Sequence, residues 1–196
     1  MEPNFKNMSK VELGSYVVEH PESQDAFDAF VDRFSTSSSE IQDKTSTNLK
    51  KEQRNQKFQQ ILTEVSNWAT RRSEITAAAL VGSWASDQAQ LDAGIDLMFL
   101  TVSPSLFRQD HNWVNEIPWS IVGTQIYDWQ DQDRGMVWSR HLALEDGMEV
   151  KFSFGFPSWA SIDLVDFDTV RVIAGCRILY DPENLLAQLI NKVNSN

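Results

Sequence analysis

The spacing of apolar and polar residues divides the chain into three parts. In residues 1–34 apolar residues recur at helical intervals, and Ser9 followed by Glu12 is the capping-box pattern that begins a helix. Residues 35–54 are rich in Ser, Thr, Lys and Gln and nearly lack large apolar side chains, so their burial cannot offset the entropy of ordering. We therefore expect a helical hairpin, then a flexible polar linker, then a main domain over residues 55–196.

The main domain is predicted to have a mixed α/β fold. Apolar residues between positions 58 and 69 recur at the spacing of an amphipathic helix. Apolar runs and alternating patterns predict strands at residues 75–81, 95–102, 119–127, 136–144 and 148–156. The run at 95–102 is uninterrupted, which indicates a central strand covered on both faces. Asp181, which a proline follows, is predicted to be the N-cap of a closing helix.

Composition and charge narrow the classes of function. The 196 residues include 17 Lys and Arg against 28 Asp and Glu, a formal net charge of -11. This balance disfavours non-specific nucleic-acid binding, which needs clustered Lys and Arg. No apolar run approaches the roughly 20 residues of a membrane helix, and the opening residues lack a signal-peptide pattern. We expect a cytoplasmic protein with no nucleic-acid or membrane partner.

The hairpin is unusually acidic, with eight acidic and three basic residues among the first 40. Two readings stay open at this point: a solvated acidic face, or a surface for a protein partner.

One segment of the main domain suggests nucleotide chemistry. The predicted strand 75–81 is followed by Gly82 and Ser83, and the next strand begins with Gly94-Ile95-Asp96. A glycine lets backbone N–H groups approach a phosphate, and a serine hydroxyl adds a donor. Carboxylates at alternate positions of a strand point to one face, where they can hold Mg²⁺ against a triphosphate.

These elements resemble the nucleotidyltransferase superfamily, particularly its aminoglycoside adenylyltransferase-like and minimal nucleotidyltransferase branches. The pattern there is Gly-Ser-x-Ala-Arg-Gly, a short loop, then Ser-Asp-x-Asp-Leu. The resemblance continues through EVKFSFGFPSWA and GCRILYDPENLLAQL, and it covers about residues 57–192. It implies a small mixed sheet with helices packed on it. It also implies transfer of a nucleoside monophosphate from ATP or another NTP, with Mg²⁺, to a hydroxyl acceptor.

The resemblance also assigns roles to individual residues. Gly82 and Ser83 match the phosphate-binding turn, and Asp96 matches the second of the paired metal carboxylates. The first carboxylate is replaced by Gly94, and the third is expected at the position of Lys151. Because two metal ions need several carboxylates, the resemblance implies weakened or lost catalysis.

Two hypotheses follow from these departures. In the first, Asp92, Asp87 or Glu149 supplies a missing carboxylate and the chain is a nucleotidyltransferase. In the second, the ammonium of Lys151 takes the place of a metal ion, pairs with Asp96 or a phosphate, and permits nucleotide binding without transfer. The second hypothesis makes the chain a nucleotide-sensing or partner-binding module, with an antitoxin-like or regulatory role.

Trp84 stands within the phosphate turn itself. Three readings of its side chain stay open: it closes over a bound base, it blocks the pocket, or it packs in the core, as most buried indoles do.

Overall fold

The protein has a mixed α/β fold, as the sequence predicts. The structure is a computed structural model and describes residues 5–86, 90, 93–163 and 165–195. It divides into two compact units, Met1–Gln53 and Arg54–Asn196. Within the described residues, no helix combines the length and the apolar character that crossing a bilayer requires.

The first unit begins with a short 3-10 turn, η1 (Phe5–Asn7), followed by α1 (Lys10–Glu19) and the start of α2 (Gln24–Thr70). The predicted capping box is confirmed. The Ser9 hydroxyl accepts from the backbone N–H of Glu12 at 3.3 Å, and the Glu12 carboxylate accepts from the backbone N–H of Ser9 at 2.8 Å. Both bonds satisfy N–H groups that a helix start leaves free.

Residues 35–54, for which the sequence predicts a linker, are helical and belong to α2. The segment between Pro21 and Gly82 contains neither glycine nor proline. Its Ser, Thr, Lys and Gln residues each cost a helix at most about 0.7 kcal/mol relative to Ala, so nothing in this segment ends the helix. The prediction rested on the lack of apolar residues to bury and did not take into account that these residues are all tolerated in a helix.

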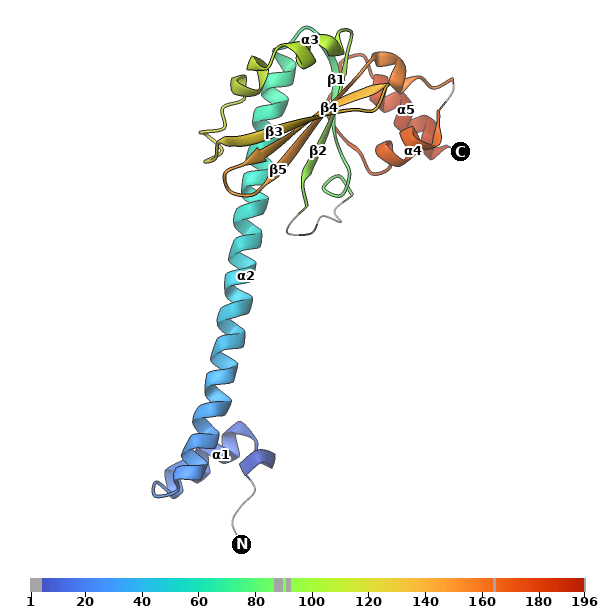
Figure 1. Cartoon of the computed structure of the whole chain (residues 1–196). Coiled ribbons are helices and arrows are strands. Elements are labelled where there is room, and N and C mark those ends of the chain that lie inside the picture. Colours follow the sequence, from blue (N-terminus) through green and yellow to red (C-terminus); the bar gives the residue numbers. More distant parts are fainter. Residues whose placement is uncertain (1–4, 87–89, 91–92, 164, 196) are drawn as a thin grey trace. The chain divides into compact units, whose positions relative to one another are not determined.

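The second unit is built on a six-stranded sheet with the order β3-β4-β5-β2-β1-β6 (Figure 1). Its strands are β1 (Ile75–Val81), β2 (Ile95–Thr101), β3 (Ile126–Asp133), β4 (Val137–Leu144), β5 (Glu149–Gly155) and β6 (Arg177–Tyr180). β2 and β5 are parallel, and the other neighbouring pairs are antiparallel. β2 lies between β5 and β1 and is buried apart from Asp96, which confirms the predicted central strand.

The strand predicted at residues 119–127 is wrong. Trp119 and Val122 are buried in a turn, and β3 starts only at Ile126. Trp119 and Val122 thus pack in the core from a turn, whereas Ile121 is exposed. The polar sequence that follows forms an edge strand, where exposed Asp and Gln side chains are tolerated.

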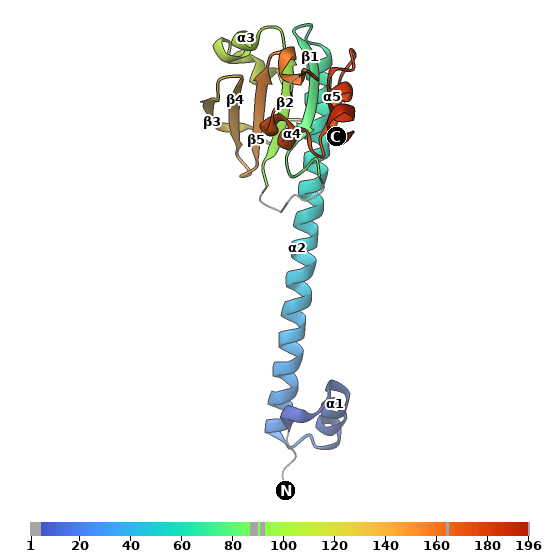
Figure 2. The ribbon, with the colours of Figure 1, turned by 90° about the vertical axis from the view of Figure 1, so that its right-hand side faces the viewer.

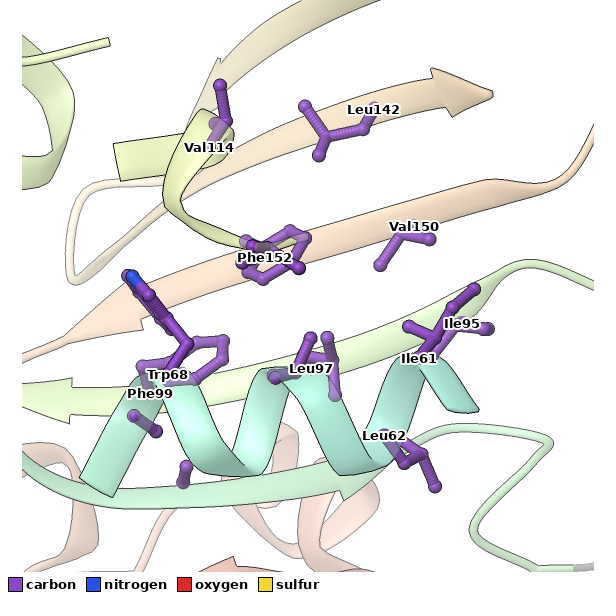
Figure 3. Close-up of a cluster of buried hydrophobic side chains, with 14 of the residues drawn as sticks. Ile61, Leu62, Trp68, Ile95, Leu97, Phe99, Val114, Leu142, Val150 and Phe152 are labelled. Atoms are coloured by element: carbon purple, nitrogen blue, oxygen red, sulfur yellow. The ribbon is translucent and has the colours of Figure 1, made fainter. Parts of the chain in front are cut away.

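Two layers of helix cover the sheet (Figure 2). One face packs on the part of α2 after Arg54, together with α3 (Pro104–Gln109) and η2 (Asn112–Glu116). Figure 3 shows this core, where Ile61 of α2 lies beside Ile95 of β2, and Trp68 lies beside Phe99. The opposite face carries η3 (Pro157–Ala160), α4 (Phe167–Ile173) and α5 (Leu185–Asn194).

The closing helix begins later than the sequence predicts. α5 starts at Leu185, and the N-cap residue is Asn184, whose φ of 58° lies in the left-handed region. The side chain of Asp181 nevertheless accepts hydrogen bonds from the backbone N–H groups of Leu185 and Ala187, at 2.8 and 2.9 Å. Asp181 thus satisfies backbone N–H groups at the start of α5, although it lies before the N-cap position.

We expect Asp181→Ala to lower the free energy of unfolding by about 1 kcal/mol, the usual cost of losing a side-chain cap. Urea denaturation measures the change, with Glu183→Ala in the same loop as the control. Equal midpoints for the two variants would contradict this role of Asp181.

Candidate functional site

A cavity of about 510 Å³ opens on the sheet face that lies opposite α2. Its floor consists of outward-facing residues of β4, β5 and β2. One wall is formed by α4 and the residues just before it, and another by the turn between β3 and β4. Pockets for small ligands commonly have volumes of about 300–1,000 Å³, so the cavity is large enough to hold one.

The strand register arranges the residues of this sheet face in three rows. Each row crosses β4, β5 and β2 in that order: His141, Lys151 and Asp96; Ser139, Ser153 and Met98; Val137, Gly155 and Leu100. Of these residues, His141, Gly155 and Leu100 do not line the cavity. The first row is charged, the second is mainly hydroxylic and the third is apolar. Polarity therefore decreases along the strands from one end of the floor to the other.

Lys151 and Asp96 face each other on adjacent parallel strands and form an ion pair. Lys151 Nζ lies 2.7 Å from Asp96 Oδ1, and the two side chains are 36% and 31% exposed. The contact is one of the two that the second hypothesis gives for the ammonium group, which pairs there with Asp96 or with a phosphate. Both residues line the cavity, so the pair is accessible to a ligand.

Gly82 directly follows β1 and lies beside Asp96 of this ion pair. Its φ is +75°, and a Cβ at this position would lie 2.8 Å from Asp96 Oδ2. Both the left-handed backbone and the close approach exclude a side chain here. The glycine therefore brings backbone into the same corner of the cavity as Asp96 and Lys151.

Ser83 and Trp84, also predicted to bind nucleotide, do not line the cavity. The indole of Trp84 stacks on Phe58 of α2 with a centroid distance of 4.1 Å, and its N–H donates to the carbonyl of Ala93 at 3.1 Å. Trp84 thus packs against the helix on the other face of the sheet. Of the three readings of Trp84, the geometry matches packing in the core.

The carboxylates that the structure describes do not fit a pair of Mg²⁺ ions. A Cβ on Gly94 would lie 3.5 Å from that of Glu149, so Glu149 stands beside the position of the missing carboxylate. Asp96 already pairs with an ammonium group. Within the described ranges, no three acidic, His or Cys side chains converge as metal ligands. Asp92 and Asp87 lie outside the described residues.

Two arginines that sequence reasoning missed also line the cavity. Arg134 comes from the turn between β3 and β4, and Arg171 comes from α4. Neither forms an ion pair with any residue that the structure describes. Of the acidic residues on the α4 wall, Asp166 accepts from the backbone N–H of Thr169 at 2.7 Å and thereby caps the helix. The cavity lining thus includes two guanidinium groups without an ion pair among the described residues, together with the carboxylates of Asp166 and Asp168.

His141 lies at the edge of this charged row. Burial lowers the pKa of its imidazole, and the positive charges of Lys151 and Arg134 lower it further against the opposing effect of Asp96 and Glu149. Its Nε2 atom is buried without a hydrogen-bond partner in the described part of the chain. The imidazole is therefore neutral at pH 7.

This lowered pKa predicts a pH dependence of stability. The unfolded chain protonates the imidazole below its ordinary value of about 6.5, whereas the folded protein does so only at lower pH. Stability should therefore fall as the pH drops through this window, and His141→Gln should flatten the decline. Urea denaturation at a series of pH values between 8 and 5 measures it. An unchanged slope in the variant would contradict this role of His141.

Comparison with known proteins relates the helical part of the chain to a protein family. A model described as a family of unknown function (DUF6887) matches residues 2–67, which include α1 and most of α2 and end before the sheet. No curated protein matches the chain. The chain is thus similar to that family over about its first third, and the cavity lies outside the match.

Proposed function

We propose that the chain binds a nucleotide on a nucleotidyltransferase-like sheet without the metal ions of an active transferase. The observation that carries this proposal is the 2.7 Å ion pair between Lys151 and Asp96 on the floor of the cavity. Asp96 occupies the position of a metal carboxylate in the family that the sequence resembles. Its partner is an ammonium group at the position where that family has another carboxylate.

An ammonium group suits this place because it is a compact positive charge with several donors. It neutralises Asp96, which would otherwise repel a phosphate, and it keeps further N–H donors for phosphate oxygens. Arg134 and Arg171 add two guanidinium groups on the surrounding walls. Together these cations supply electrostatic attraction that Mg²⁺ gives in a transferase.

A lysine at the position of a metal carboxylate also removes the metal ligation that nucleotidyl transfer needs. A metal ion stabilises charge in the transition state by several kcal/mol, and paired metals hold both the attacking and the leaving oxygen. An ammonium tied to Asp96 provides neither this geometry nor an activated hydroxyl. We therefore propose a nucleotide-sensing protein.

Calorimetric titration of ATP, GTP, CTP and UTP tests the proposal, once in excess EDTA and once in excess Mg²⁺. We expect at least one nucleotide to bind in EDTA with an affinity within a few-fold of that in Mg²⁺. Binding that appears only with Mg²⁺ would overturn the metal-free site. Absence of binding in both conditions would overturn nucleotide recognition altogether and favour a protein-partner role.

One observation favours a second candidate, an active nucleotidyltransferase. Glu149 stands beside Gly94 and is exposed, so its carboxylate is near the place of the missing first metal ligand. In that case nucleotide binding would require Mg²⁺, and Glu149→Gln would abolish it. In the metal-free proposal Glu149→Gln leaves binding in EDTA intact.

A further inference from the structure

The chemical character of the cavity lining changes from one end of the cavity to the other. Lys151 and Gly155 are four residues apart on β5, about 13 Å at a rise of about 3.3 Å per residue, and Trp159, which packs on the buried Gly155, lines the cavity at that end. The Lys151 end carries the ion pair and the Gly82 turn. A ligand that fills the cavity therefore meets different chemistry at its two ends.

Arg171 of α4 also lines the cavity. A Cβ on Gly175, just after α4, would lie 3.1 Å from the Cβ of Ser86, so the C-terminal end of the helix approaches the loop that follows Gly82. Arg171 stands one helical turn before Gly175. The C-terminal part of α4, which carries Arg171, therefore lies near the loop that follows Gly82.

The opposite end is aromatic and apolar. Trp159 of η3 lines the cavity, and its Cβ lies 3.6 Å from the position of a Cβ on Gly155. The carbonyl oxygen of Met136 lies 3.6 Å from that same position, and the Met136 side chain is 63% exposed. Val137 completes this end. Met98 Cε lies 3.0 Å from the position of a Cβ on Gly155, so Gly155 itself is covered, and Trp159, Met136 and Met98 form the apolar lining at this end. An indole and thioether groups suit contact with a flat aromatic group.

Hydroxyl groups occupy the middle of the floor. Ser139 Oγ and Ser153 Oγ are 2.9 Å apart and hydrogen-bonded, and both residues are buried and line the cavity. Each hydroxyl can donate one hydrogen bond and accept two, so the pair retains capacity for a ligand hydroxyl. This position, two residues from Lys151 and two from Gly155, fits a sugar.

Resting on the nucleotide-binding proposal, we infer that the ligand is a nucleoside polyphosphate bound in one orientation, with its base stacked on Trp159 and its phosphates at Lys151 and Arg171. The sugar then lies over the Ser139–Ser153 pair. This order of aromatic, hydroxylic and cationic groups matches the order of base, ribose and phosphates in the ligand. A sugar phosphate or an inorganic polyphosphate would leave the apolar end unfilled.

Calorimetry in EDTA with ATP and with inorganic tripolyphosphate tests the orientation. Because stacking of one base is worth roughly a tenfold to hundredfold change in affinity, the wild type should bind ATP at least tenfold more tightly than tripolyphosphate. Trp159→Leu should remove this difference and leave tripolyphosphate affinity unchanged, whereas Trp159→Phe should largely retain it. Trp129→Leu, which removes an exposed indole outside the cavity, is the control for both ligands.

The outcomes separate the two proposals. If neither ligand binds, nucleotide recognition fails and the orientation fails with it. If both bind with equal affinity in the wild type, or if Trp159→Leu weakens both equally, the orientation is overturned while phosphate binding stands. A loss confined to ATP supports the stacked base.

Discussion

Replacement of Lys151 by Met should lower the affinity for ATP about a hundredfold when binding is measured in EDTA. The variant keeps an unbranched side chain, one atom shorter than that of Lys, and removes its charge. A hydrogen bond to a charged group contributes about 1.5–3 kcal/mol, and about 1.4 kcal/mol corresponds to a tenfold change. The loss of binding free energy should be at the upper end of this range, because Asp96, which is 31% exposed, becomes an unpaired carboxylate facing the phosphates.

The control for this variant is Lys192→Met, which removes an exposed lysine from α5 outside the cavity. It makes the same change in net charge and should leave the affinity within twofold of the wild type. A Lys151→Met protein that binds ATP as the wild type does would contradict the role of the ammonium group. Equal losses in both variants would show a general effect of net charge instead.

Arg140→Ala should lower the free energy of unfolding by about 3 kcal/mol, the scale for breaking a buried ion pair. Arg140 is fully buried, and its guanidinium donates two hydrogen bonds to Asp131, at 2.8 and 2.9 Å. Its Nη2 also lies 2.7 Å from His111 Nδ1. The guanidinium stacks near three indoles, with centroid distances between 5.1 and 5.8 Å: those of Trp113, Trp129 and Trp138. The alanine variant loses all of these contacts and leaves a cavity in the core.

Urea denaturation, followed by tryptophan fluorescence, measures this loss. Arg108→Ala is a matched control because Arg108 pairs with Asp133 of the same strand β3, but both side chains are about half exposed. Its midpoint should match the wild type, since exposed ion pairs contribute little. Equal midpoints for Arg140→Ala and the wild type would contradict the structural role of the buried guanidinium.

The sequence predicts the centre of the candidate site well because that part depends on local pattern. The parallel register of β2 and β5 brings Lys151 opposite Asp96, as the motif comparison suggests. Gly82 is placed by the turn that ends β1, and its positive φ is one that glycine readily adopts. These residues belong to short segments whose alternation fixes which face each side chain occupies.

Other parts of the site depend on distant packing and leave no local signal. The direction of Trp84 is set by its stack on Phe58 of α2, which the turn sequence does not encode. Arg171 reaches the cavity only because α4 packs over the sheet. The sequence around Arg140 indicates only a strand; its partner Asp131 becomes evident from the register of β3 and β4, which places the two residues opposite each other.

Titration of Mg²⁺ alone into the nucleotide-free protein tests the central claim most directly. If the Lys151 ammonium takes the place of the metal ion, no saturable binding should be seen up to about 10 mM Mg²⁺, since the site supplies too few oxygen ligands for a hard cation. Asp96→Asn should then give the same trace as the wild type. Saturable Mg²⁺ binding that Asp96→Asn abolishes would contradict the account and make Asp96 a metal ligand.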